Sequence, residues 1–269
     1  MEKSSGQALN PQIIKPKKQL GQHWLKQKSV LNKIIYAADL KKDDLVIEIG
    51  PGLGILTKEL AKKAGRVISI EKDLALIPIL KNNLQGLKNI EIISGDALRI
   101  DFGNFENYKI VANLPYYAAT AIIRKLLESK IKPKLMVLML QKEVAQRICA
   151  KPPKMSLLGI SVQLYAEVKI IDYVSKNAFW PKPIVDSAVI KLEIKNSKLK
   201  IDKDLFFKII KAGFSQPRKQ LLNNLSNGLD LPKEEIKNWL EDNGINPSKR
   251  GQDLDLKDWL NLARKFPGP

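Results

Sequence analysis

The sequence predicts an α/β protein with a doubly wound, mostly parallel sheet, followed by a small part made only of helices. Two observations lead to this fold class. Short apolar runs rich in Val, Ile and Leu alternate with helical patterns through the first two thirds of the chain, as they do in doubly wound folds. From about residue 198 onward the apolar spacing is helical throughout, with breaks at Gly, Pro and Asn. We therefore expect two domains, residues 1–197 and 198–269.

The elements of the first domain follow from local patterns. Apolar residues at helical spacing predict helices, and continuous apolar runs predict buried strands. The expected helices cover residues 29–40, 55–64, 73–84, 119–129 and 142–150. The expected parallel strands cover residues 45–49, 66–70, 90–93, 108–112 and 135–140. Two later strands, around residues 161–170 and 187–194, are expected to pair as a hairpin-like addition at the sheet edge.

The second domain and the two ends of the chain are simpler. Helices are expected at residues 204–214, 218–225, 232–243 and 256–265. Residues 1–18 are polar and basic and are expected to form a flexible tail, because they have neither the apolar core of a signal peptide nor the Arg-rich composition of a transit peptide. No apolar run approaches the roughly 20 residues of a membrane span. The expected location is the cytoplasm.

The small number of cysteine and histidine residues argues against several kinds of metal and catalytic site. The chain has one cysteine, Cys149, and one histidine, His23. A single cysteine allows neither an intrachain disulfide nor a cysteine metal cage. A single histidine argues against histidine metal sites and Ser-His-Asp triads. We expect no bound metal.

The charge of the chain is the first positive indication of function. There are 46 Lys and Arg against 28 Asp and Glu, a formal net charge of +18. The excess is uneven, because residues 122–160 carry nine basic residues against two acidic ones, whereas the end of the chain from residue 200 is nearly balanced. Clustered positive charge is typical of proteins that bind nucleic acids. A Lys-rich composition imposed by an AT-biased genome is the alternative.

The first expected strand ends in a glycine-rich turn. Gly50, Gly52 and Gly54 follow Glu48-Ile49, and a helix follows them. Glycines let the backbone approach a ligand, and the helix N-terminus offers free N–H groups. A dinucleotide fingerprint needs a glycine at the sixth position, which here is Ile55. The turn therefore gives little reason to expect a pyrophosphate.

Three further strand ends carry polar groups. Glu71 ends the second strand and suits the two hydroxyls of a ribose, although a solvated charge is an equal alternative. The Gly95-Asp96-Ala97 segment follows the third strand and offers an acceptor for an adenine amino group. Asn113-Leu114-Pro115-Tyr116 follows the fourth strand, where a simple turn is the alternative. Because ligands bind beyond the carboxyl ends of parallel strands, the four loops together predict a site for a nucleoside-like ligand.

Motifs along nearly the whole chain resemble those of one family. They occur at residues 18–25 (KQLGQHWL), 48–57, 71, 95–97, 113–117, 178–188 (AFWPKPIVDSA), 214–219 (FSQPRK) and 250–254 (RGQDL). This set resembles the S-adenosylmethionine-dependent methyltransferases, specifically the small-subunit (16S) ribosomal RNA adenine dimethyltransferases of the kasugamycin-sensitivity type. The resemblance implies a Rossmann-like methyltransferase sheet with a C-terminal helical domain for RNA recognition.

The resemblance also implies a set of residues that bind S-adenosylmethionine. His23 and Leu25 would hold the cofactor from the N-terminal side, Glu71 its ribose and Asp96 its adenine amino group. The full expected set is His23, Leu25, Gly50, Gly52, Glu71, Asp96, Ala97 and Asn113. The family often has Asn-Phe where this chain has His23-Trp24. A histidine still donates or accepts one hydrogen bond, and simple surface packing of His23 is the alternative.

The expected reaction sets the remaining site residues. An adenine amino nitrogen is a poor nucleophile because its lone pair is delocalised into the ring, and acceptors for both of its N–H groups direct that lone pair out of the plane. Asn113 offers a side-chain oxygen and Leu114 a backbone carbonyl, whose direction Pro115 restricts. Tyr116 is expected to stack on the flipped base. By resemblance, Phe179 is the opposite face of the clamp, although a core aromatic is an equal alternative.

The expected substrate is two adjacent adenosines in the 3′-terminal hairpin of small-subunit ribosomal RNA, within an immature 30S particle, and the expected state is a monomer. Two other interpretations stay open. One is a large-subunit ribosomal RNA adenine methylase that confers macrolide resistance. The other is a non-catalytic RNA- or DNA-binding relative, against which the intact Glu71, Asp96, Asn113 and Tyr116 argue.

Overall fold

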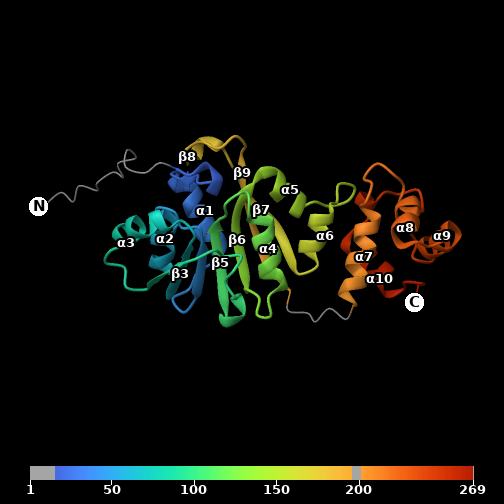
Figure 1. Ribbon diagram of the computed structural model, residues 1–269, viewed down its shortest axis with the longest axis horizontal. Coiled ribbons are helices and arrows are strands. Elements are labelled where there is room, and N and C mark those ends of the chain that lie inside the picture. Colours follow the sequence, from blue (N-terminus) through green and yellow to red (C-terminus); the bar gives the residue numbers. More distant parts are fainter. Residues whose placement is uncertain (1–15, 196–200, 269) are drawn as a thin grey trace, which may run out of the picture.

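A seven-stranded sheet forms the centre of the molecule in the computed structural model, which describes residues 16–195 and 201–268 (Figure 1). Its strands lie in the order β4-β3-β2-β5-β6-β9-β7. Their bounds are β2 Leu45–Ile49, β3 Arg66–Glu71, β4 Ile90–Ser94, β5 Tyr108–Asn113, β6 Leu135–Gln141, β7 Ala166–Val174 and β9 Ser187–Ile194. All five predicted parallel strands are present within one or two residues of their expected bounds.

The order of pairing creates a switch point in the middle of the sheet. Strands β2 to β6 pair in parallel. The chain runs outward from β2 through β3 to β4, and then crosses to the other side of β2 to form β5. The loops after β2 and β5 therefore diverge and leave a crevice at the carboxyl ends of the strands, which is where ligands bind in such sheets.

The last two strands pair antiparallel, as predicted for an edge addition. Strand β9 pairs with β6 on one side and with β7 on the other. The strand that comes last in the sequence is thus inserted between two earlier ones, and β7 becomes the edge of the sheet.

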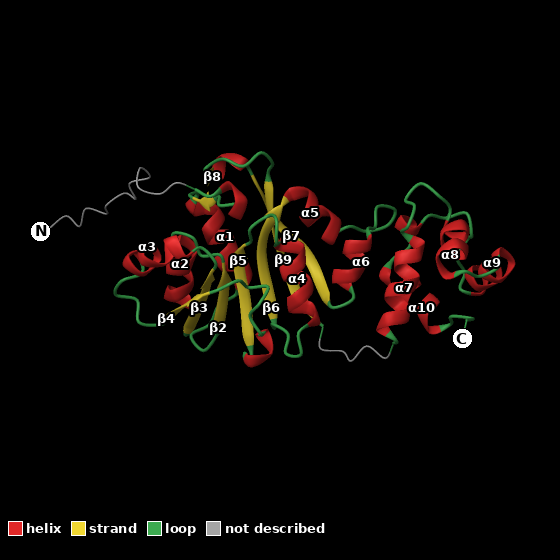
Figure 2. Cartoon of the chain, viewed as in Figure 1, coloured by secondary structure: helices red, strands yellow, loops and turns green. Residues whose placement is uncertain are grey.

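Helices cover both faces of the sheet (Figure 2). Alternate residues of β2 show the two faces, since Val46 packs in a cluster with α1 and α2, whereas Ile47 packs in a cluster with α4 and α5. This alternation follows from the two-residue period of a strand. The helices are α1 Lys28–Ala38, α2 Ile55–Lys63, α3 Ile77–Asn83, α4 Ala119–Glu128, α5 Lys142–Ile148 and α6 Leu157–Gln163. Short 3-10 helices are η2 Lys18–Leu20, η3 Leu74–Leu76, η4 Phe102–Asn104, η5 Lys176–Ala178 and η6 Gly251–Asp253.

The C-terminal part is helical, as expected, and lies at the opposite end of the molecule from α2 and α3 (Figure 1). Its helices are α7 Lys203–Gly213, α8 Leu221–Leu229, α9 Lys233–Asp242 and α10 Leu256–Arg264. The Met155 N–H donates to the Gln252 carbonyl at 3.0 Å, which joins this part to the region before α6. The predicted domain boundary after residue 197 and most of the predicted N-terminal tail lie outside the described residues, so both stay predictions.

Two sequence predictions were wrong in detail. The strand expected at 161–170 begins only at Ala166, because α6 occupies the residues before it. The Ser156 hydroxyl accepts from the Gly159 N–H at 2.9 Å and so caps α6. The helix expected at 218–225 instead begins at Leu221. In the described chain, every helix is too short or too polar to cross a bilayer.

A small two-stranded ribbon has no counterpart among the sequence predictions. Strand β1 (Trp24–Leu25) pairs antiparallel with β8 (Phe179–Trp180). The Trp24 and Trp180 rings stack with their centroids 5.3 Å apart. This ribbon holds the N-terminal segment against the carboxyl ends of the parallel strands.

Candidate active site

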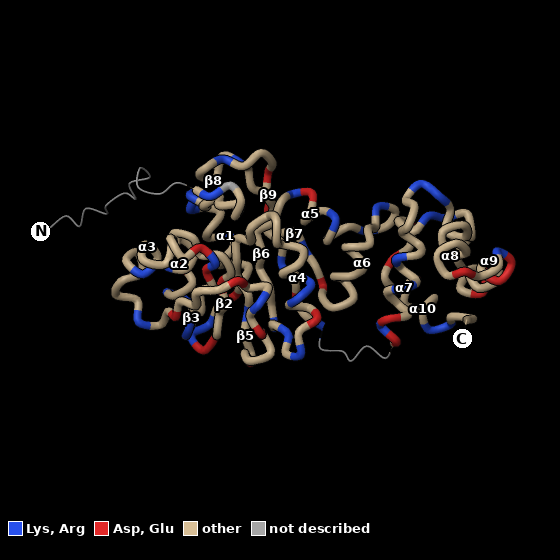
Figure 3. The backbone as a smooth tube through the Cα atoms, viewed as in Figure 1, with Lys and Arg blue, Asp and Glu red and all other residues tan. Residues whose placement is uncertain are grey.

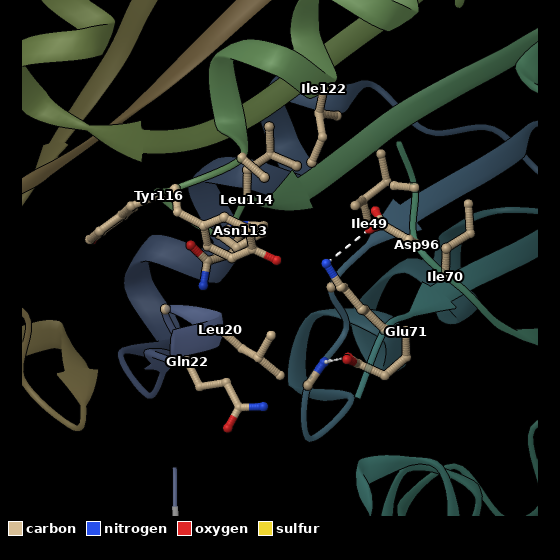
Figure 4. Close-up of a pocket in the computed structure, with 18 of the residues that line it drawn as sticks. Leu20, Gln22, Ile49, Ile70, Glu71, Asp96, Asn113, Leu114, Tyr116 and Ile122 are labelled. Carbon is tan, nitrogen blue, oxygen red and sulfur yellow. Dashed lines mark hydrogen bonds and ion pairs between the residues drawn. The ribbon is translucent and has the colours of Figure 1, made fainter. Parts of the chain in front are cut away.

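A cleft of about 750 Å³, partly open to solvent, lies at the carboxyl ends of the parallel strands. All four loops predicted from the sequence contribute to its wall, together with residues 20–24 from the N-terminal segment. Figure 4 shows Asp96 and Glu71 on one side of the cleft, Tyr116 on the opposite side, and Asn113 and Leu114 between them. Leu20 and Gln22 reach into the same space.

The glycine turn after β2 is held tightly by the rest of the protein. Gly50, Gly52 and Gly54 all have positive φ, which favours glycine. A Cβ atom on Gly52 would lie 2.5 Å from the Trp24 ring, and one on Gly54 would lie 2.8 Å from Leu80. Two of the three glycines are therefore required for packing within the protein. Gly50 and Gly52 also line the cleft.

Glu71 is fixed by backbone donors. The Gly52 N–H donates to its Oε2 at 3.1 Å, and the Asp73 N–H donates to its Oε1 at 2.8 Å. Burial raises the pKa of Glu71, and the two N–H donors oppose this. The carboxylate is thus oriented at the cleft wall before any ligand binds, with lone pairs left to accept from a diol.

Asp96 faces a lysine that the sequence analysis did not single out. The Lys72 ammonium lies 2.9 Å from Asp96 Oδ2 and 5.7 Å from the centre of the Tyr117 ring. The Leu98 N–H donates to Asp96 Oδ1 at 2.9 Å. The Lys72 hydrogen bond holds the pKa of Asp96 below its usual value, so this side chain is an anionic acceptor. Ala97 lines the cleft beside it.

Asn113 and Leu114 present two acceptors at the end of β5. The Asn113 side-chain N–H donates to the His23 carbonyl at 3.0 Å. Because a carbonyl only accepts, this bond fixes which end of the amide is nitrogen. Among the described residues, no donor reaches the Asn113 side-chain oxygen or the Leu114 carbonyl. Pro115 follows and lines the same wall.

Tyr116 and His23 form the far side of the cleft. Tyr116 shares a 2.6 Å hydrogen bond with the Ser187 hydroxyl, which fixes the position of its ring. The His23 ring stacks against Tyr116, with centroids 5.8 Å apart and planes 28° apart. His23 Nδ1 lies 2.7 Å from the Pro181 carbonyl and therefore carries the proton. His23 is thus part of the wall and not a loosely packed surface residue.

Two of the predicted site residues do not line this cleft. Phe179 is 2% exposed and packs in the cluster with α1 and α2, where β8 pairs it with Leu25. Leu25 is buried in the same cluster and borders a smaller cavity behind the glycine turn. To act as one face of a clamp, Phe179 would have to leave that cluster. The ring that lies against Tyr116 is that of His23.

A buried acid lies behind the site. Glu48 is 2% exposed, and its Oε2 accepts from the Thr57 hydroxyl at 2.6 Å and from the Ser69 hydroxyl at 3.3 Å. Burial raises the pKa of Glu48 to about 8, against the opposing effect of these two hydroxyl donors. The side chain is therefore protonated at neutral pH.

Several residues that line the cleft received no role of their own in the sequence analysis, although some of them lie within the motifs at residues 18–25, 48–57 and 113–117. They are Leu20, Gly21, Gln22, Trp24, Ile49, Ile70, Lys72, Leu76, Tyr117, Ala118 and Ile122. Lys72 directly follows Glu71, so its position was a usable signal. Residues 20–24 come from a segment remote in sequence, and the ribbon between β1 and β8 helps to bring them to the cleft.

Comparison with known proteins finds relatives along nearly the whole chain. The family described as ribosomal RNA adenine dimethylase matches residues 13–266. A ribosomal RNA small subunit methyltransferase A from Dehalococcoides mccartyi is 44% identical over 261 residues, which are 95% of this chain and 90% of that protein. A protein of the same name from Clostridium botulinum is 44% identical over 263 residues, 95% of each chain.

Two solved structures have a similar fold. A dimethyladenosine transferase from Plasmodium falciparum aligns with a TM-score of 0.77 and 33% identity, covering 90% of this chain and 96% of that one. A 23S rRNA methyltransferase, ErmE, aligns with a TM-score of 0.77 and 25% identity, covering 91% and 100%. The equal TM-scores mean that backbone shape alone does not separate these two kinds of protein.

Proposed function

The chain belongs to the ribosomal RNA adenine dimethylase family, and from that premise we propose that it dimethylates the exocyclic amino nitrogen of two adjacent adenosines in small-subunit ribosomal RNA. The methyl donor is S-adenosylmethionine, which supplies an activated methyl group when bound. The observation that carries the proposal is the convergence of Glu71, Asp96 and Asn113 on one cleft at the switch point of the sheet.

The cleft fits this methyl donor. The Glu71 carboxylate, already oriented by two backbone donors, would bind the ribose hydroxyls. The Asp96 carboxylate lies beside apolar wall residues such as Ile70 and Ala97, a combination that suits a planar adenine with an amino group. Gly50 and the N-terminal segment would enclose the methionine end. His23 is the part of that segment that faces the cleft, and Leu25 follows it and is buried behind the glycine turn.

Asn113 and Leu114 would bind the target base. Two acceptors free of protein donors suit the two N–H groups of an adenine amino group. Tyr116, held by Ser187, offers an aromatic face for stacking. Alignment of the amino nitrogen with the methyl group would supply most of the rate. No strong base is needed, because the nitrogen loses its proton after the methyl group has arrived.

Sequence identity favours the small subunit as the source of the substrate. The relatives that act on the small subunit by name are 44% identical to this chain. The large-subunit methyltransferase has the same TM-score as the dimethyladenosine transferase but only 25% identity. A macrolide-resistance methylase is therefore the second candidate.

Exposed basic residues offer a surface for RNA. Figure 3 shows basic segments between α5 and α6 and between α7 and α8. Lys151 and Lys154 lie in the first of these, and Arg218 and Lys219 in the second. The Leu221 N–H donates to the Lys249 carbonyl at 2.7 Å, which brings Lys249 and Arg250 to the same end of α8. Such clusters bind phosphates through counterion release.

The finer points of the proposal concern the target and its setting. We place the two adenosines in the 3′-terminal hairpin, within an immature 30S particle, and the reaction in ribosome biogenesis. The enzyme would act there as a cytoplasmic monomer. Loss of activity, as in a binding-only relative, is disfavoured because Glu71, Asp96 and Asn113 are all present at the cleft.

The deciding experiment is transfer of labelled methyl groups from S-adenosylmethionine to small subunits that lack these modifications. Large-subunit RNA serves as the parallel substrate, and the products are mapped by mass spectrometry. We expect dimethyladenosine at two neighbouring positions of the small-subunit RNA alone. Label in large-subunit RNA would favour the resistance methylase, and no label despite cofactor binding would favour a binding role.

Replacing the ribose-binding acid should weaken cofactor binding. In Glu71→Gln, the side-chain NH₂ group would face the Gly52 or Asp73 N–H, so one donor is placed against another and the anionic acceptor is lost. We expect the affinity for S-adenosylhomocysteine, measured by calorimetry, to fall about 10- to 100-fold. Glu91→Gln changes an exposed carboxylate on the neighbouring strand and should leave the affinity as it is. An unchanged affinity in Glu71→Gln would show that the Glu71 carboxylate does not bind the cofactor.

A further inference from the structure

The N-terminal segment of residues 17–24, here called the strap, forms one wall of the cleft. Leu20, Gly21, Gln22, His23 and Trp24 all line it. None of the sheet strands contributes to this wall, so the cleft is closed on that side by a segment from outside the sheet. The strap therefore covers one side of a nucleoside bound in this partly open cleft.

The two ends of the strap are held in different ways. At its C-terminal end, Trp24 is 7% exposed and stacks on Trp180, and the Asn113 side chain donates to the His23 carbonyl. This end is fixed by burial and by the ribbon with β8. The N-terminal end, residues 17–22, has no such pairing among the described residues.

The N-terminal end is tied to the rest of the protein by Asp73. The Lys17 ammonium lies 2.7 Å from Asp73 Oδ1, and the Gln22 side-chain N–H donates to Asp73 Oδ2 at 2.8 Å. The Lys17 backbone N–H donates to the Gln22 side-chain oxygen at 2.7 Å, which closes the contact into a ring. The side-chain hydrogen bonds that Lys17 and Gln22 make to the sheet domain both end on this one carboxylate.

Asp73 is also bonded to the acid at the cleft wall. Its backbone N–H donates to Glu71 Oε1 at 2.8 Å, and its Oδ1 accepts from the Ala75 N–H at 3.1 Å. The Asp73 side chain is 5% exposed, whereas that of Lys17 is 51% exposed. The carboxylate is therefore held rigidly, whereas the half-exposed lysine side chain can move away and break the ion pair.

We propose that Asp73 is a positioning residue that latches the strap, and that the Lys17–Asp73 contact slows release of the bound cofactor. The inference rests on the proposed function, because it takes an S-adenosyl nucleoside as the occupant of the cleft. The Lys17–Asp73 contact, here called the latch, joins the strap to the loop that follows Glu71. The closure of this contact and the orientation of the Glu71 side chain therefore both depend on Asp73.

The test measures the binding of S-adenosylhomocysteine to the full chain. Calorimetry gives its affinity, and stopped-flow tryptophan fluorescence gives its release rate. Lys17→Met removes the ammonium and keeps the apolar stem, at a half-exposed position where the fold is not at risk. We expect about a fivefold loss of affinity, as for a partly exposed ion pair, and a matching increase in the release rate. Lys17→Arg keeps the cation and should restore both.

A matched control uses a remote ion pair. Lys33 lies 2.6 Å from Asp172 with similar exposure, 53% for the lysine. Lys33→Met should leave affinity and release rate unchanged. Raising the salt concentration should weaken binding in the wild type more than in Lys17→Met, because salt screens the Lys17–Asp73 ion pair, which only the wild type has.

Asp73→Asn tests whether the effect of Lys17→Met comes from loss of the Lys17–Asp73 contact. Combined with Lys17→Met, it should weaken binding by less than the product of the two single effects, because both changes break the same contact. Wild-type affinity in Lys17→Met, or multiplicative effects in the double variant, would overturn the latch while leaving the proposed function in place. Failure of the wild type to bind S-adenosylhomocysteine would overturn the proposed function, and the latch with it.

Discussion

Asn113→Ala is expected to abolish measurable methyl transfer, a loss of at least about 100- to 1000-fold, which is the range for one preorganised hydrogen-bonding group at a reacting centre. The side-chain oxygen at this position is the acceptor that we assign to the target amino group, and alanine offers none. The fold should survive, because within residues 16–195 and 201–268 the Asn113 side chain makes a single hydrogen bond, to the His23 carbonyl. Initial rates on undermethylated small subunits and a thermal unfolding curve give the two quantities.

Asn89→Ala is the matched control for Asn113→Ala. The Asn89 side chain also donates to backbone carbonyls, those of Ala61 and Ala64, but it lies away from the cleft. Its loss should lower the unfolding temperature and leave the rate per folded molecule unchanged. Full methyl transfer by Asn113→Ala would refute the role that we propose for its oxygen.

Replacing the buried acid should change how stability depends on pH. Glu48 is protonated in the folded protein up to about pH 8, whereas in the unfolded chain it ionises above its ordinary pKa of 4.5. Between these values the unfolded state binds fewer protons than the folded state, so the free energy of unfolding falls as the pH rises. Above pH 8 the accumulated loss is roughly 5 kcal/mol.

Glu48→Gln removes this titration and keeps the shape of the side chain. From pH 5 to pH 9, the variant should gain roughly 4 kcal/mol of unfolding free energy relative to the wild type, as measured by urea unfolding at each pH. Glu59→Gln changes an exposed carboxylate on α2 and should differ from the wild type by the same amount at both pH values. Parallel pH curves for wild type and Glu48→Gln would show that Glu48 is ionised in the folded protein.

The sequence predicted the sheet better than the segments around it. Strand β2 has its expected bounds because the run Leu-Val-Ile-Glu-Ile, which is apolar except for Glu48 and lies between Asp44 and Gly50, fits a buried strand of that length. Residues 157–163 were missed as a helix because they are short, apolar and partly β-branched, so that periodicity does not distinguish them from a strand. In the fold, Ser156 caps this helix, and Gly159 packs closely, because a Cβ atom there would lie 2.7 Å from the Arg147 carbonyl.

The site was predicted in the same uneven way. Glu71, Asp96 and Asn113 were predictable because each lies at or just beyond the carboxyl end of a parallel strand, and these ends meet at one edge of the sheet. The motif at residues 18–25 indicated that the N-terminal segment reaches the site, but its latch depends on contacts between residues more than 50 positions apart, such as Gln22 and Asp73, which the local sequence does not indicate. Phe179 was linked to the base by resemblance, whereas its pairing with Leu25 buries it.

The insertion of β9 between β6 and β7 bears on how the protein is made. Translation delivers β7 before β9, which is its only partner within the sheet. Until residue 194 has emerged from the ribosome, the edge of β6 is an open template for wrong pairing.

The same strand begins with Ser187, whose hydroxyl holds Tyr116. The nascent chain therefore passes through an interval in which the strands that lead to Glu71 and Asp96 are complete, while Tyr116 lacks its hydrogen-bond partner. Arrival of one late strand both seals the sheet and finishes the site, so a ribosome that stalls before it leaves a chain that is aggregation-prone and inactive at once.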